Sequence, residues 1–258
     1  MDDFRENGSR TRMEGRKYKA TLQYLGTRYA GWQVQKGHST VQGVVENALL
    51  RLAGQAVAVV GAGRTDAGVH ALGQVAHFRF PHRDSVPDLL KSLNALLPWD
   101  IRAVRLERTD DGFHASRHAR RKRYQYRIYN GDFLPPFEHL RACHVARPLD
   151  LERMADAAAR FLGEHDNSGF AAASTRVRSK VRTIATSQIL QRGSVILYRV
   201  EASGFLHHMV RNMVGTLLQA GLGDRPCEDV DRIFLSRDRG QAGPTAPAHG
   251  LYLVRVWY

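Results

Sequence analysis

The stretch GAGRTDAGVHA, residues 61–71, places one carboxylate, Asp66, in a glycine-rich loop that follows a short apolar run. Such loops can bind phosphate, but a Walker loop ends in Gly-Lys-Ser/Thr, and the dinucleotide fingerprint needs a small residue where Asp66 stands. A carboxylate would also repel a pyrophosphate group. Two interpretations remain. Asp66 caps a turn of helix that begins near Ala67, or it is a nucleophile whose negative charge a nearby arginine such as Arg64 stabilises.

The charge balance of the chain favours the second interpretation. Lys and Arg number 38 against 25 Asp and Glu, which gives a formal net charge of +13 over 258 residues. This excess favours a polyanionic partner, nucleic acid before an anionic membrane surface, although a basic soluble protein without such a partner is the plainer alternative. A carboxylate within an RNA-binding surface repels phosphates, so it is easier to understand if it performs chemistry.

The segment RHARRKRYQYR, residues 117–127, interleaves basic and aromatic side chains. On a strand, Tyr124 and Tyr126 share one face. Basic residues beside an exposed aromatic ring suit a surface that follows a nucleic-acid backbone and stacks on its bases. The alternative is a strand with half-buried tyrosines. Farther along, residues 174–182 place Arg or Lys at every second position, so an extended segment there would present one basic face or a plain solvated edge.

The segment SGFLHHMVRN raises the question of a metal site, because His207 and His208 are adjacent. On a helix, adjacent side chains point about 100° apart and no HExxH spacing is present, so we expect no metal here. Arg211 follows His207 by four residues, which places both on one helix face. Near a helix start the macrodipole disfavours an arginine, which indicates a specific carboxylate partner.

Hydrophobic periodicity indicates the elements that position these residues. It predicts helices at 39–52 (capped by Ser39), 85–97 (capped by Ser85), 150–162 (capped by Asp150), 207–222 and 227–236. It predicts strands at 17–25, 56–60, 74–80, 101–107, 123–129, 181–190, 194–203 and 251–258. The order is β-α-β-β-α-β, repeated less regularly in the second part. The expected fold class is therefore α+β: two related split-βαβ, ferredoxin-like halves with mainly antiparallel sheets around a central cleft.

We divide the chain into a disordered N-terminal lead-in (1–16), an N-terminal α+β domain carrying the catalytic loop (17–112) and a C-terminal α+β domain (113–258). Cys143 and Cys227 show no CxxC spacing, which argues for a reducing compartment. The N-terminus has no signal-peptide core and no apolar run approaches the ~18 residues that span a bilayer. We therefore expect a cytoplasmic protein that does not enter the membrane.

The loop sequence GRTDAGVHALGQVAHF resembles the signature of the TruA family of tRNA pseudouridine synthases. The RTDAGVHA segment followed by HHMVRN is the most specific part of this resemblance. Further matching segments are YLGTRYAGWQVQ (24–35), SLNALLPWDIRA (92–103), FHASRHARRKRYQYRIYN (113–130), GFLHHMVRNMVGTL (204–217) and GPTAPAHGLYL (243–253).

The resemblance implies an isomerase that converts uridine to pseudouridine in tRNA without a metal, nucleotide or redox cofactor. It implies that Asp66 is the catalytic aspartate, Tyr124 stacks on the base, Arg211 pairs with Asp66, and Arg64 helps to displace the target nucleotide. It further implies uridines 38, 39 and 40 of the anticodon stem-loop as targets, and a homodimer. The rival function is a basic RNA-binding protein without catalysis, for which Asp66 would have no use.

Overall fold

The structure is a computed structural model that describes residues 15–81 and 85–258. Residues 1–14 of the expected lead-in lie outside the described residues. Gly15 and Arg16 are described, and Arg16 is already the first residue of strand β1 (Arg16–Tyr24).

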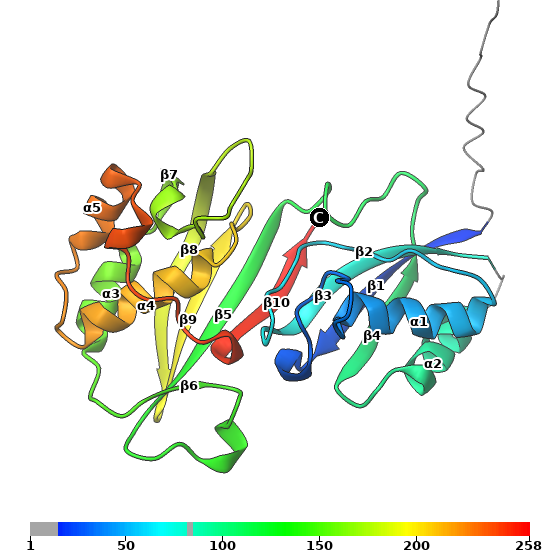
Figure 1. Cartoon of the computed structure of the whole chain (residues 1–258), viewed down its shortest axis with the longest axis horizontal. Coiled ribbons are helices and arrows are strands. Elements are labelled where there is room, and N and C mark those ends of the chain that lie inside the picture. The colour runs from blue at the N-terminus through cyan, green and yellow to red at the C-terminus, as the bar shows by residue number, and fades with distance from the viewer. Residues whose placement is uncertain (1–14, 82–84) are drawn as a thin grey trace, which may run out of the picture.

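One large sheet organises the described residues (Figure 1), with the strand order β4-β1-β3-β10-β5-β9-β8-β7, while β2 pairs with β3 and β6 with β5. The pairs β10–β3 and β5–β6 are parallel and the others antiparallel. The strands are β1 (Arg16–Tyr24), β2 (Val60–Gly61), β3 (His70–Phe80), β4 (Ile101–Arg108), β5 (Arg121–Asn130), β6 (Cys143–Val145), β7 (Gly163–Asp166), β8 (Val181–Arg192), β9 (Val195–Ala202) and β10 (Leu251–Trp257).

The helices begin close to their expected positions. Ser85 and Asp150 cap α2 and α3 as predicted, because their side chains accept hydrogen bonds from backbone N–H groups of the first turn. The predicted cap Ser39 is wrong: Thr40 is the extended residue whose hydroxyl accepts from the Gly43 N–H at 3.3 Å. The helices are α1 (Val41–Ala53), α2 (Val86–Leu96), α3 (Leu151–Ala159), α4 (Met209–Gly221) and α5 (Asp229–Ser236), with short 3-10 turns at Gly26–Arg28, Pro136–Glu138, Ser168–Phe170, Arg239–Gln241 and Ala248–Gly250.

The predicted fold class is confirmed, and the two halves meet at the C-terminal strand. Helices α1 and α2 lie against β1, β3 and β4, whereas α3, α4 and α5 gather beside β8 and β9 (Figure 1). Strand β10 pairs with β3 on one side and β5 on the other, so it joins the two halves into one sheet. Within residues 15–81 and 85–258, no helix is long and apolar enough to cross a lipid bilayer.

One predicted strand, and one segment for which an extended conformation was considered, differ from the structure. In segment 56–60 only Val60 pairs within the sheet. Val57 and Val59 are buried as expected, but the Val59 N–H donates to the Glu46 side chain and its carbonyl oxygen accepts from Gln42. These side chains of α1 satisfy the backbone that a neighbouring strand would otherwise bind. Likewise, residues 174–180 form an irregular loop before β8, so they present no single basic strand face.

Candidate active site

The loop that carries Asp66 connects β2 to β3 and is tied to the segment after β1. The Thr65 carbonyl oxygen accepts from the Trp32 N–H at 3.0 Å, and the Thr65 hydroxyl lies 2.8 Å from the hydroxyl of Tyr24. Gly31 allows this close approach, because its φ is +92° and a Cβ there would lie 2.5 Å from the Thr65 oxygen. These contacts fix the backbone of the loop and therefore the position from which the Asp66 side chain projects.

The cap interpretation of Asp66 is wrong. Residues 67 and 68 form a turn, and no helix begins at Ala67. The Asp66 carboxylate instead binds Arg211 near the start of α4: Arg211 Nη1 lies 3.2 Å from Asp66 Oδ2. Arg211 Nε donates to the carbonyl oxygen of Ala246 at 2.7 Å, which fixes the orientation of the guanidinium group. Both side chains are mostly buried: 21% of the Asp66 side chain and 15% of the Arg211 side chain are exposed.

His207 and His208 also lie beside Asp66, which the sequence did not predict. We expected the two histidine side chains to point about 100° apart because a helix was predicted from residue 207. In the structure α4 begins at Met209, and His208 has a φ of +60°. Because both histidines precede the helix, the 100° rule does not apply to them. Their Nε2 atoms lie 3.6 Å and 3.5 Å from the two carboxylate oxygens, and their ring centroids are 3.9 Å apart.

These three side chains could hold a metal ion, since their donor atoms all lie within 4.8 Å of one another. Burial lowers the pKa of His208, and the positive charges of His207, Arg211 and Arg239 lower it further against the opposing effect of Asp66. A neutral imidazole is the form that binds metals. Arg211 opposes a metal here, because its cationic group already occupies one carboxylate oxygen of Asp66.

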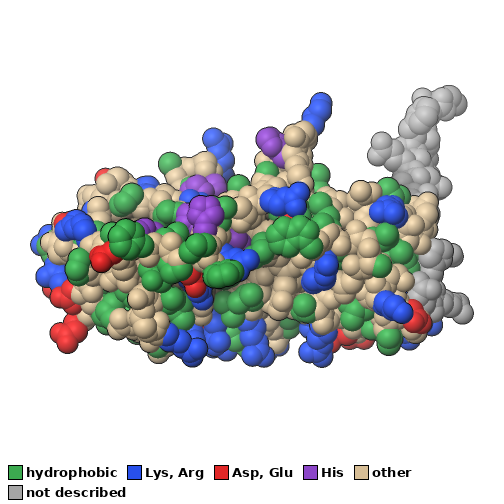
Figure 2. Space-filling model, turned by 90° about the horizontal axis from the view of Figure 1, so that it is seen from below, with side chains coloured by type: hydrophobic (Ala, Val, Ile, Leu, Met, Phe, Trp, Pro, Cys, Tyr) green, Lys and Arg blue, Asp and Glu red, His purple; other side chains and the backbone are tan. Residues whose placement is uncertain are grey.

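A cleft of about 1240 Å³ opens around Asp66. Among the described residues that line it, Asp66 is the only carboxylate, and the other charged side chains are basic. A polyanion entering the cleft therefore meets a mainly cationic wall. On the face of the molecule seen in Figure 2, Lys and Arg side chains gather along one edge, while Asp and Glu lie mainly towards the two ends. The Lys and Arg residues that line the cleft are Arg64, Lys122, Arg176, Arg182 and Arg211.

Strand β5 brings Tyr124 to the floor of this cleft. Tyr124 is 7% exposed and packs edge-on against Phe205, another lining residue, with ring centroids 5.0 Å apart. Tyr126 is fully buried, and its hydroxyl donates to the carbonyl oxygen of Pro247. The two tyrosines thus share one face, as predicted, but only Tyr124 reaches the cleft. Phe205 precedes the HHMVRN segment, and its aromatic character was the one signal that could have indicated it.

Arg64 lies at the rim of the cleft with its side chain exposed. No ion pair joins Arg64 to Asp66, and Arg64 has no hydrogen-bond partner within the part of the chain that the structure describes. The arginine that binds the carboxylate is therefore Arg211, 145 residues away, and the guanidinium of Arg64 is available to a ligand.

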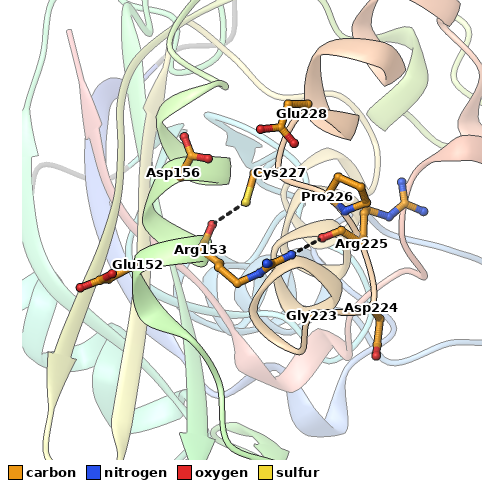
Figure 3. A pocket seen from close by; sticks show the side chains of 9 residues that line it. All are labelled: Glu152, Arg153, Asp156, Gly223, Asp224, Arg225, Pro226, Cys227 and Glu228. Atoms are coloured by element: carbon orange, nitrogen blue, oxygen red, sulfur yellow. Dashed lines mark hydrogen bonds between the residues drawn. The ribbon is translucent and has the colours of Figure 1, made fainter.

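A second cavity of about 650 Å³ lies between α3 and the α4–α5 connection (Figure 3). Its polar groups serve packing: Arg153 donates to the carbonyl oxygen of Arg225, and the Cys227 thiol donates to that of Arg153. Carboxylates surround this cavity, so it does not suit a polyanion. They are Glu152, Asp156, Asp224 and Glu228.

The sequence profile of the tRNA pseudouridine synthase family matches residues 20–116 and 157–258. These ranges include Asp66 and Arg211 and cover well over half of the chain. The chain belongs to this family. Its members are isomerases, so the chain is an enzyme of that class.

Individual relatives agree with this assignment. The tRNA pseudouridine synthase A of Myxococcus xanthus is 44% identical over 243 residues, which cover 94% of this chain and 92% of the relative. The proteins of the same name from Ligilactobacillus salivarius and Limosilactobacillus reuteri are 42% and 43% identical over 246 and 248 residues, covering 94% of this chain and 96% of each relative. A solved archaeal box H/ACA ribonucleoprotein complex matches with 14% identity and a TM-score of 0.33 over 87% of this chain and 60% of that one, which is too weak to support an argument.

Proposed function

We propose that this pseudouridine synthase isomerises uridines of tRNA with Asp66 as its nucleophile. One observation carries the proposal: the Asp66 carboxylate faces a cationic cleft, and Arg211 binds one of its oxygens at 3.2 Å. A carboxylate in such a cleft repels phosphates and weakens binding, so a chemical role explains its presence better than a structural one. The surrounding cations attract the RNA, and the carboxylate meets the nucleoside.

The reaction is an isomerisation and needs no net oxidant or reductant. The N1–C1′ bond breaks, the uracil rotates, C5 joins C1′, and the proton on C5 leaves for N1 or solvent. The carboxylate can attack C1′ of the ribose, attack C6 of the base, or act through a glycal intermediate. Each route requires the target uridine to leave its stack, at a cost of roughly a few kcal/mol.

The side chains around Asp66 supply the remaining roles. The Tyr124 ring stacks on the extruded base, which recovers about 1–3 kcal/mol. Arg211 holds the carboxylate in place through its two hydrogen bonds. Arg64, exposed at the rim and unpaired among the described residues, enters the RNA and helps to displace the nucleotide.

We further propose that the targets are uridines 38, 39 and 40 of the anticodon stem-loop. This assignment rests on the resemblance of RTDAGVHA and HHMVRN to the TruA family. Incubation of unmodified tRNA transcripts with the protein, followed by mapping of pseudouridine at each position, tests both the reaction and the sites. Pseudouridine elsewhere, with none at these positions, would contradict the site assignment. Tight binding of the transcripts without any pseudouridine would favour the non-catalytic RNA-binding protein.

We also propose that the protein is a cytoplasmic homodimer. Two large apolar side chains in the loop between β5 and β6 support a second copy, since Phe133 and Phe137 are 85% and 86% exposed. Cys143 and Cys227 are both free and buried, which is compatible with a reducing compartment. Sedimentation of the wild type against Phe133→Asp tests the dimer, and a monomeric wild type would contradict it.

A further inference from the structure

Lys122 lies in the cleft on the same strand and the same face as Tyr124. Both belong to β5 and both line the cavity around Asp66. Residues i and i+2 of a strand point to one face and their Cα atoms lie about 7 Å apart. Lys122 is paired in register with Ala202 and Val256, whose small or apolar side chains offer it no charge partner.

No anionic group of residues 15–81 or 85–258 pairs with the Lys122 ammonium. Among the described residues it forms no ion pair or hydrogen bond. Its neighbours Arg121 and Arg123, on the opposite face of β5, both pair with Glu201. Burial lowers the pKa of the Lys122 ammonium, and the charge of Arg182 lowers it further. An ammonium group held in this way is destabilising until an anion joins it.

The catalytic loop leaves room for this ammonium group at Gly63. A Cβ on Gly63 would lie 2.8 Å from Lys122 Nζ, so the side chain occupies the space that any larger residue would fill. The Gly63 carbonyl oxygen accepts from Gln74 at 2.8 Å, which fixes the loop at this point. Lys122 is therefore held against the backbone of the loop that carries Asp66, three residues before the carboxylate.

We propose that Lys122 binds a phosphate of the RNA backbone beside the nucleotide whose base stacks on Tyr124. The inference rests on the proposed function of the cleft and adds to it a specific anion site. A lysine ammonium is a compact point charge that suits a phosphodiester oxygen. The phosphate supplies the anion that the described part of the chain does not offer to Lys122, and the site fixes the distance between the RNA backbone and the stacked base.

The binding of this phosphate is coupled to a proton. The other charged or titratable groups that line the cleft with Lys122 are Arg64, Asp66, Tyr124, Arg176, Arg182, His207, His208 and Arg211. Burial raises the pKa of Tyr124, so its hydroxyl stays neutral where the Lys122 ammonium begins to lose its proton. In the free protein the pKa of Lys122 lies below its ordinary 10.5. A bound phosphate favours the ammonium form and so raises the pKa of Lys122. RNA binding at a pH between the pKa of the free protein and the pKa of the complex therefore draws a proton onto Lys122.

Four variants test the site through the salt dependence of binding to an anticodon stem-loop RNA. Lys122→Met removes the charge and keeps the length, Lys122→Arg keeps the charge, and Gly63→Ala displaces the ammonium without altering Lys122. Lys91→Met, on the exposed face of α2, is the matched control. For Lys122→Met we expect affinity about tenfold lower and a slope of log K against log salt smaller by about 1. Gly63→Ala shifts both values in the same direction, whereas Lys122→Arg and Lys91→Met keep the wild-type slope.

Calorimetry separates this role from a structural one. RNA binding is measured at several pH values up to the ordinary lysine pKa of 10.5, each in two buffers of different ionisation enthalpy, which gives the number of protons taken up. We expect uptake by the wild type and by Lys91→Met, and its loss in Lys122→Met and in Lys122→Arg, since arginine is already charged. The melting temperature of Lys122→Met should equal or exceed that of the wild type, because no protein partner is lost. The proposal is overturned if Lys122→Met takes up as many protons as the wild type does, or if its salt slope equals that of the wild type.

The same measurements distinguish this inference from the proposed function. If the wild type binds the RNA but forms no pseudouridine, the proposed reaction fails, and the slope and proton uptake still decide whether Lys122 binds phosphate. If pseudouridine forms and Lys122→Met retains the wild-type slope, only the phosphate site is wrong.

Discussion

Arg211 and Asp66 are 145 residues apart in the sequence and 3.2 Å apart in the structure. The contact joins the two halves of the molecule, because the carboxylate stands on the loop before β3 and the guanidinium on the first turn of α4. Arg211 is itself held by the loop before β10, through the Ala246 carbonyl oxygen. The position of the proposed nucleophile therefore depends on three segments that only the folded sheet brings together.

Arg211→Lys should impair turnover more than binding. The lysine keeps the positive charge but cannot bind Asp66 and the Ala246 oxygen together in the fixed geometry of a guanidinium. A displacement of about 1 Å at a reacting group can lower a rate about 100-fold, so we expect kcat to fall by about that factor with KM little changed. Arg232→Lys, on the exposed surface of α5, is the control and should leave both constants unchanged. A variant with normal kcat would show that Arg211 does not position the nucleophile.

Gly215→Ala should loosen the loop that holds Arg211. Gly215 lies on α4 where the Gly243–Pro244 backbone crosses it, and a Cβ there would lie 1.7 Å from the Pro244 carbonyl oxygen. The loop must move, and we expect a loss of about 1–3 kcal/mol in the free energy of unfolding, with lower kcat in the folded fraction. Denaturant unfolding and steady-state rates measure the two effects. Gly112→Ala has open space around its Cβ and should change neither; equal stability of the two variants would refute the close contact.

Substitutions of Tyr124 should separate its ring from its hydroxyl. Burial raises the pKa of Tyr124, so the hydroxyl stays protonated at neutral pH and the aromatic face supplies the binding energy. We expect Tyr124→Phe to bind RNA within about threefold of the wild type, and Tyr124→Leu to lose about 1–3 kcal/mol of stacking energy. Fluorescence titration with a stem-loop RNA measures both. If Tyr124→Phe lost as much RNA affinity as Tyr124→Leu, the stacking role would be contradicted.

His77 should make stability depend on pH. Its Nδ1 accepts from the Ala115 N–H at 3.1 Å, and burial, followed by the charges of Lys17 and His114, lowers its pKa to about 4. The folded pKa lies below the unfolded value of about 6.5, so this contribution is complete above pH 6.5 and is lost as the pH falls towards 4. It amounts to roughly 3 kcal/mol. Urea unfolding at several pH values should show a flatter profile for His77→Gln than for the wild type; parallel profiles would exclude this coupling.

Local sequence predicted most of the elements, because apolar periodicity and caps such as Ser85 and Asp150 act over a few residues. Where prediction failed, side chains from elsewhere decided the backbone. Glu46 and Gln42 bind the backbone around Val59, so that segment stays buried without the ladder of a strand. No local pattern contains that information, since the partners belong to a preceding helix.

The composition of the candidate site was predicted better than its geometry. Asp66, Tyr124, Arg64 and Arg211 all line the predicted cleft, but their roles still come from the family resemblance. The contact between His208 and Asp66 could not be foreseen, because it depends on a left-handed residue at the start of α4. The helix begins two residues later than predicted, so the helical geometry expected for His207 and His208 does not apply.

The release of tritium from C5 of uridine in tRNA tests the proposed role of Asp66 most directly, because C5 exchanges its hydrogen for the bond to C1′. A 5-³H-uridine transcript is incubated with the wild type and with Asp66→Ala, and binding of the same RNA is measured in parallel. We predict that the wild type releases tritium and that Asp66→Ala binds the transcript but releases none. Release by Asp66→Ala at the wild-type rate would show that this carboxylate is not the nucleophile.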